Sequence, residues 1–263
     1  MNAGPTRRLT VVLHDKPQSQ RLLDLGVRIA SQLQAELEGV FVEDAALFRL
    51  TGLPFLREVK RDSFTEERLD STRLLKEWRA TAKLAREALE SSATRAGLAW
   101  SFRVWRGEID SGLQQLALES QMLLLGRLVA CVPSRYPAMR NPVQNRPGPL
   151  KLGVILDSGK ATERLLEAVG ELSLKPEIQL IILLLPGGEP AQGVPLEQRL
   201  KEIDPQHHNV LVRLTDKSPE LLITRLKAAA CDLLMVSEDS ELLRGRNIPQ
   251  PLRGLPYPVV VVR

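Results

Sequence analysis

The hydrophobic pattern of the chain repeats one order of strand and helix twice. Residues 9–15 read LTVVLHD and residues 150–157 read LKLGVILD, each an apolar strand running into an aspartate ahead of an amphipathic helix. Farther along each half, residues 100–127 and 208–239 each read as a strand, a polar turn, a helix and a strongly apolar strand. This duplication predicts two similar α/β domains, each with its site where strand ends meet helix starts.

In the first half, the pattern predicts strands at 9–14, 39–42, 102–105 and 122–125, with no clear fifth strand. Helices are expected at 21–37, 65–96 and 110–120, the second with apolar residues at alternating steps of three and four. Apolar, non-alternating strands joined by helical crossovers favour a parallel sheet covered on both faces.

The regular pattern stops after Gly126. Residues 131–149 hold five prolines, which exclude a long helix and disfavour a central strand. The second half then shows five strands, at 152–156, 178–185, 210–214, 233–236 and 258–262, with helices at 162–172, 195–203 and 218–231. We therefore expect a first domain at 1–130, a Pro-rich basic linker at 131–149 and a second domain at 150–263.

Composition and charge narrow the protein class. No apolar run approaches the roughly 20 residues that span a bilayer, and the N-terminal residues lack a signal-peptide core, so we expect no membrane and a cytoplasmic location. Cys131 and Cys231 are too few for a disulfide framework, and Cys231 is expected to fill the core near a helix end. Residues 120–156 hold five basic residues and no acidic one, but no nucleic-acid-binding motif accompanies them. A solvated linker is favoured over a nucleic-acid site.

These patterns resemble the universal stress protein family in its tandem two-domain form. The resemblance rests on the aspartate after the opening strand (Asp15 and Asp157), on the strand–glycine–helix–strand block at 103–126, and on the closing LRGLPYPVVVVR at 252–263. It implies two α/β domains with parallel sheets in the order 3-2-1-4-5, helices on both faces, packed as an internal pseudo-dimer. Fifth strands commonly pair across that interface in the family, and Ala130–Val132 could substitute in the first domain.

The resemblance also implies where a nucleotide would lie. In family members that bind ATP, the aspartate after strand 1 and the end of strand 2 hold the adenosine, and a G-x-x-G, nine residues, G-[ST] stretch after strand 4 holds the phosphates. The corresponding first-domain residues are His14, Asp15, Val42, Gly126 and Arg127. No second glycine follows Gly126 at the right spacing, although Arg127 could hold a phosphate in place of the missing amides.

In the second domain, the phosphate position carries acidic residues. Glu238, Asp239 and Glu241 stand where phosphates would lie, and close carboxylate–phosphate repulsion costs on the order of a few kcal/mol. This site is therefore not expected to bind ATP, which leaves ATP or another adenine nucleotide possible only in the first domain. These acidic residues could also bind a cation, but they lack the ligand spacing of a calcium loop. A solvated acidic loop is therefore the favoured interpretation.

No catalytic or metal-binding constellation emerges from the remaining polar residues. His14–Asp15 lacks a nucleophile nearby, and His207–His208 lies in an expected turn without the three or four convergent ligands that a metal needs. We expect a non-enzymatic stress-response or regulatory protein that acts through contacts with an unknown protein partner, with a further homodimer left open. The alternative is an ATP- or AMP-binding sensor with slow or no hydrolysis; a nucleic-acid binder through the basic linker is a third.

Overall fold

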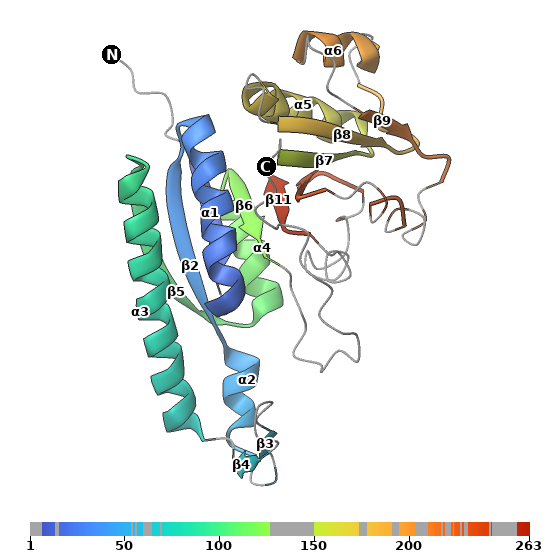
Figure 1. Cartoon of the computed structure of the whole chain (residues 1–263). Coiled ribbons are helices and arrows are strands. Elements are labelled where there is room, and N and C mark those ends of the chain that lie inside the picture. Colours follow the sequence, from blue (N-terminus) through green and yellow to red (C-terminus); the bar gives the residue numbers. More distant parts are fainter. Residues whose placement is uncertain are drawn as a thin grey trace.

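In the computed structural model, the two halves build one continuous mixed sheet with helices on both faces (Figure 1). The structure describes residues 7–263 apart from 14–15, 54, 56, 60–64, 69, 127–149, 174–177, 191–194, 204–209, 217, 219–221, 223, 227, 229–230, 242 and 244–256. Within the described residues, the sheet has nine strands, and a separate two-stranded hairpin lies outside it.

The first domain supplies four parallel strands of this sheet, in the order β5-β2-β1-β6. Its elements there are β1 (Arg8–Leu13), α1 (Lys16–Leu33), β2 (Glu36–Asp44), β5 (Trp100–Gly107), α4 (Ile109–Glu119) and β6 (Met122–Leu125). Because β5 is the third strand of the main sheet along the chain, this order is 3-2-1-4, as the resemblance implies. The first helix starts earlier than predicted, at Lys16, and also ends earlier, because the chain turns at Gln34, whose φ is 51°, and continues into β2.

The second domain supplies five parallel strands, in the order β9-β8-β7-β10-β11. Its elements are β7 (Leu150–Leu156), α5 (Gly159–Ser173), β8 (Ile178–Leu184), α6 (Leu196–Ile203), β9 (Val210–Arg213), β10 (Leu233–Ser237) and β11 (Val259–Val262). Residues 222, 224–226 and 228 are helical, inside the predicted helix at 218–231. The order 3-2-1-4-5 is thereby confirmed for this domain.

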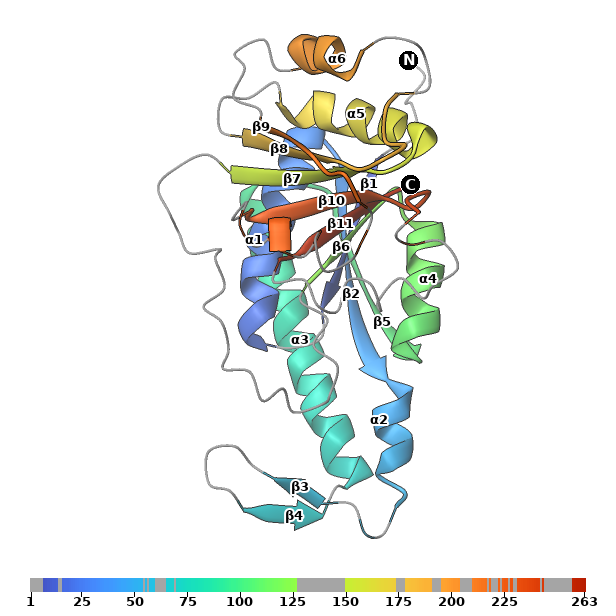
Figure 2. The same cartoon turned by 90° about the vertical axis from the view of Figure 1, so that its right-hand side faces the viewer.

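The two domains join where the first domain's own fifth strand was expected. There β11 of the second domain lies antiparallel to β6, with Val262 opposite Met122 and Val259 opposite Leu125. On its other edge β11 pairs in parallel with β10, so one strand serves both domains (Figure 2). The suggested substitute Ala130–Val132 lies outside the described residues.

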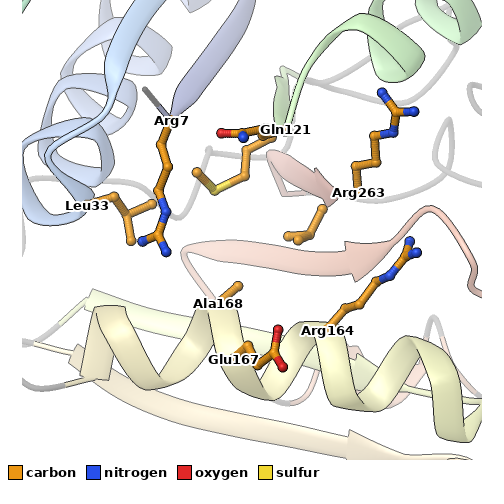
Figure 3. A pocket seen from close by; sticks show the side chains of 9 residues that line it. Arg7, Leu33, Gln121, Arg164, Glu167, Ala168 and Arg263 are labelled. Atoms are coloured by element: carbon orange, nitrogen blue, oxygen red, sulfur yellow. The ribbon is translucent and has the colours of Figure 1, made fainter. Parts of the chain in front are cut away.

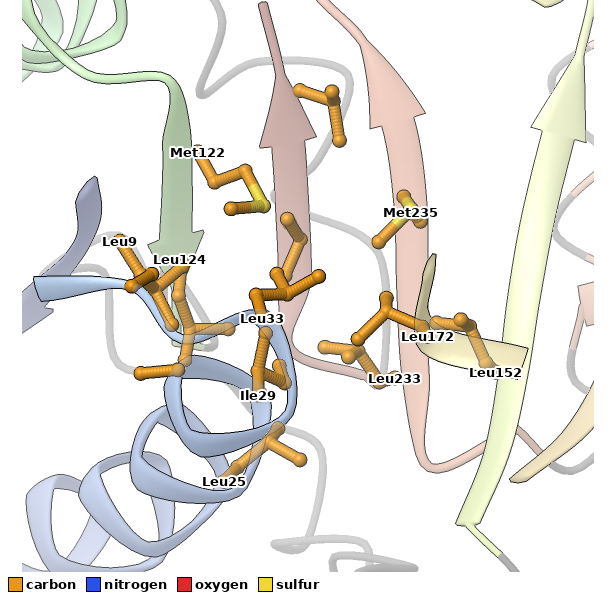
Figure 4. Close-up of a cluster of buried hydrophobic side chains, with 14 of the residues drawn as sticks. Leu9, Leu25, Ile29, Leu33, Met122, Leu124, Leu152, Leu172, Leu233 and Met235 are labelled. Carbon is orange, nitrogen blue, oxygen red and sulfur yellow. The ribbon is translucent and has the colours of Figure 1, made fainter. Parts of the chain in front are cut away.

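Two apolar cores cover the two faces of the sheet, and each runs across the domain junction. On one face, α1 packs on β1 and β2 while α5 packs on β10, β7 and β8, and the two helices contact each other across the junction. Leu33 of α1 and Leu172 of α5 belong to the same apolar cluster (Figure 4). On the other face, α4 together with Leu222 and Leu226 packs in one cluster with Val12, Leu125, Val236 and Val261. The two halves therefore share their apolar cores across the junction, because β11 pairs with a strand of each half.

An arm projects from the first domain between β2 and β5, away from the second domain (Figures 1 and 2). It comprises α2 (Ala45–Leu50), the hairpin of β3 (Arg57–Val59) and β4 (Glu66–Arg68), and the first turns of α3 (Ser71–Arg95). The predicted helix at 65–96 is too long at its start. Asp70 caps α3 by accepting hydrogen bonds from the amides of Thr72 and Arg73, and the residues before it pair with β3.

Cys231 fills the core, as predicted, and its environment makes it unreactive. The residue is fully buried, and this burial raises the pKa of its thiol to about 11 from 9.0, with Asp232 adding a smaller effect. Because the unfolded thiol ionises first, stability should fall as pH rises from 9 towards 11. We expect no alkylation of Cys231 at pH 8 in the native protein and complete alkylation in urea, measured by peptide mass spectrometry. Labelling of the native protein at equal rate would contradict this.

No helix among the described residues is long and apolar enough to cross a membrane.

Candidate functional site

The first candidate site lies where β1, β2 and β6 end side by side. The strand register sets Val12 opposite both Val40 and Leu125, so the chain leaves all three strands at one edge of the sheet. Val42 lies on β2 at this edge and is 7% exposed, and Gly126 follows β6 directly. His14, Asp15 and Arg127 lie outside the described residues, so their roles in nucleotide binding stay predictions.

Gly126 is tightly placed at this edge. A Cβ atom there would come within 3.3 Å of Cδ2 of Leu22 on α1. A Cβ atom would therefore require the Leu22 side chain to move by a few tenths of an ångström. Small size at this position is what a close approach of a ligand to the backbone requires.

The structure adds to this edge an ion pair between a buried glutamate and a half-exposed arginine, which the sequence did not reveal. Glu43 at the end of β2 is 5% exposed in its side chain, and Arg106 on β5 holds it with Nε at 2.6 Å and Nη2 at 2.5 Å. The two residues face each other in the β2–β5 register. Only that register could reveal the pair, because 62 residues separate the partners and the arm lies between them.

The corresponding edge of the second domain is closed by the protein's own side chains. Asp157 after β7 is fully buried, and the Ser240 hydroxyl donates a 2.5 Å hydrogen bond to its Oδ2. The backbone after β10 folds over this aspartate, since the Ser240 amide also bonds to the Ser237 carbonyl at 3.0 Å. A Cβ atom on Gly188 would lie 2.2 Å from the Leu156 carbonyl oxygen, so the turn after β8 packs directly on the end of β7.

The acidic residues after β10 are ion-paired, which corrects the expectation of a solvated acidic loop. Arg164 of α5 contacts Asp239 at 2.7 Å and Glu238 at 3.4 Å, and Lys160 contacts Asp239 at 3.4 Å. The two acidic side chains are only 24% and 23% exposed. These two acidic residues therefore occupy the expected phosphate position. The positive charges of Lys160 and Arg164 on α5 are already paired with them.

Removing the Ser240 hydroxyl measures how much its hydrogen bond to Asp157 contributes to stability. In a Ser240→Ala variant, the buried Asp157 carboxylate loses a donor, which we expect to lower the free energy of unfolding by about 1–3 kcal/mol. Urea denaturation followed by circular dichroism measures the change. A Ser91→Ala variant, on the exposed side of α3, is the matched control and should change the midpoint little. Equal effects of the two substitutions would contradict the closure.

No group of three His, Cys, Asp or Glu side chains in the described part of the chain is arranged to hold a metal ion. His207 and His208 lie outside that part.

No family model matches the chain, and no curated protein matches it significantly. Among solved structures, a universal stress protein from Archaeoglobus fulgidus DSM 4304 matches with a TM-score of 0.53 and 11% identity, covering 97% of this chain and 96% of that one. A universal stress protein family member from Burkholderia pseudomallei covers 45% of this chain and 80% of its own, at 18% identity and a TM-score of 0.33. The first match, together with the strand order, shows that the chain has the universal stress protein fold over nearly its whole length.

Proposed function

We propose that the protein is a non-enzymatic stress-response or regulatory protein that acts through protein contacts, with the arm as its contact surface. The observation that carries this proposal is the lack of any buried apolar side chain among the described residues of the arm. Leu50, Leu53, Phe55 and Val59 are 40%, 37%, 77% and 54% exposed. Further apolar residues of the arm that the structure describes are half-buried: Leu47, Phe48, Leu74, Leu75 and Trp78.

Such an arm is poorly stabilised on its own. An isolated two-stranded hairpin is marginally stable in water, and contiguous exposed apolar surface on a monomer commonly marks an interaction site. The ion pairs Arg57–Glu66 and Arg73–Glu67 flank the apolar residues with both signs of charge. An apolar centre with a mixed-charge rim is typical of a protein partner rather than of nucleic acid.

A crosslinking experiment tests the arm directly. A photoreactive benzoylphenylalanine at position 55 should give a discrete adduct in stressed cells, whereas the same residue at position 104, on the exposed edge of β5, should not. A Phe55→Ser/Val59→Ser variant should also lose the stress survival that the wild-type chain restores to a deletion strain, while Val104→Ser keeps it. Full survival with the arm variant would overturn the proposal.

The alternative function is an adenine-nucleotide sensor that uses the first domain. It is favoured by the convergence of the β1, β2 and β6 ends, and by the small residue Gly126 beside them. A nucleotide at 100 times its dissociation constant should stabilise the fold by about 2.7 kcal/mol, and Asp15→Asn or Gly126→Leu should abolish that gain. Melting curves with ATP, ADP and AMP plus Mg²⁺ decide this; no rise with any of them excludes the sensor.

A further inference from the structure

A cavity lies on the seam between the two domains, and one of its lining residues is Arg164, which also pairs with the acidic residues after β10. Its volume is about 220 Å³, and it opens between the end of α1 and the middle of α5, where the start of β6 lies beside the end of β11 (Figure 3). It is smaller than the roughly 300–1,000 Å³ of sites for drug-sized ligands, so it suits a compact molecule.

The lining combines an apolar floor with a cationic rim. Leu33, Met122 and Val262 are each at most 7% exposed and form the floor with the half-buried Ala168. The charged lining residues are three arginines and one glutamate, a balance of +3 − 1 = +2: Arg7, Arg164, Arg263 and Glu167. Arg7 comes from the first domain and the other three charged residues come from the second. Glu238 and Asp239, which pair with Arg164 and Arg263, offset this positive charge. The guanidinium donors that these pairs leave unused, beside an apolar floor, favour a small anion with a short hydrocarbon part.

Arg164 and Arg263 make ion pairs with the acidic residues after β10 and still keep N–H donors for a ligand. Arg164 uses only Nη1 towards Glu238 and Asp239, and Arg263 uses Nε towards Glu238 and Nη1 towards the Leu118 carbonyl. Within the described residues, Nε and Nη2 of Arg164 and Nη2 of Arg263 have no partner. Each guanidinium carries five N–H donors, so holding the acidic loop does not exhaust either one.

Gln121 adds a neutral donor that is fixed in position. Its Oε1 accepts from the Arg8 amide at 3.1 Å, and its carbonyl accepts from the Arg263 amide at 3.0 Å. Its Nε2 makes no hydrogen bond to the described part of the chain. Because the amide oxygen is anchored, the amide nitrogen is held in place beside the cavity at little entropic cost to a ligand.

We propose that this cavity binds a compact organic anion, a short-chain carboxylate or phosphate monoester, with Arg164, Arg263 and Gln121 as donors and Met122 under its hydrocarbon part. Glu167 at the rim accepts a hydrogen bond from a hydroxyl or amino group on the ligand. Since the lining comes from both domains, the ligand's binding energy adds to their association. The site is independent of the arm and of the first-domain nucleotide edge.

Butyl phosphate and butyrate are the probes, and butylamine is the control of equal length and opposite charge. At ten times its dissociation constant, either anion should raise the melting temperature by about 3–6 °C, and butylamine should not. Arg164→Gln should weaken binding at least about tenfold, whereas Arg213→Gln should not change it. Arg213 is the matched control because it also bridges two glutamates, Glu189 and Glu197, but lies on the far edge strand β9.

Methyl labelling places the probe. With ¹³C-methyl methionine, butyl phosphate should shift the signal of Met122, which lines the cavity, and leave that of Met235, which is buried in the same core outside the cavity lining. Assignment by Met122→Leu keeps the test clear of folding effects. An unmoved Met122 signal at 50 mM probe, or a melting shift that is unchanged in Arg164→Gln, would overturn the proposal.

Discussion

Replacing Val260 with aspartate is expected to destabilise the first domain as strongly as the second, although the residue lies in β11 of the second domain. Val260 is fully buried in β11, between β6 and β10. An unpaired carboxylate there costs on the order of 3–5 kcal/mol. Because β11 completes the sheet of the first domain, that domain should lose the same stability.

The tryptophans make this coupling measurable. All three lie in the first domain, at Trp78, Trp100 and Trp105, so their fluorescence reports unfolding of that domain alone. In urea, Val260→Asp should lower the midpoint by fluorescence and by circular dichroism together. Val104→Asp, on a strand but 50% exposed, is the matched control and should move neither strongly. A fluorescence midpoint that stays in place for Val260→Asp would show that the domains fold independently.

The second large effect is expected at the ion pair beside the first-domain site. Arg106→Met leaves Glu43 buried without its partner, and we expect a loss of about 1–3 kcal/mol, less than for a fully buried pair because Arg106 is 55% exposed. The double variant Glu43→Leu/Arg106→Met should recover most of that loss, since no buried charge remains.

A double-mutant cycle in urea measures the coupling between these two side chains. The exposed pair Arg57–Glu66, with side chains 67% and 58% exposed, is the control, and Arg57→Met should stay within about 0.5 kcal/mol of wild type. If the double variant loses as much stability as the two single variants lose together, the two side chains are not coupled. Melting curves of the single variant with adenine nucleotides would also show whether the pair shapes the nucleotide edge.

Helices and strands were predicted best from the sequence where the pattern within a single segment determines its structure. The apolar strands are recognisable because both faces are covered, and the helix start of α6 follows from Pro195, whose carbonyl accepts hydrogen bonds from Gln198 and Arg199. The arm was harder. Residues 65–70 fit a helical pattern, yet β4 pairs with β3, and the Asp70 cap, not the periodicity, sets where α3 begins.

The candidate site shows the same division. The positions of Val42 and Gly126 at one edge follow from the parallel order that the repeat implies. The ion pairs at the edge of the second domain could not be predicted from the sequence, because the partners of Glu238 and Asp239 lie on α5, more than seventy residues earlier. Likewise Thr10, one polar residue in an apolar strand, is buried only because Glu38 and Ser120 meet it from two other elements.

By itself, the sequence determined the fold class, the duplicated order of strand and helix, and the loss of the glycine-rich phosphate stretch. Each of these features follows from residues that are close together in the sequence, through their periodicity and the turn residues between them. Only the tertiary structure decided that β11 serves both domains, that the acidic loop of the second domain is neutralised by α5, and that three arginines line one cavity. These depend on strand register and on contacts between distant segments, which a pattern of period two or 3.6 does not encode.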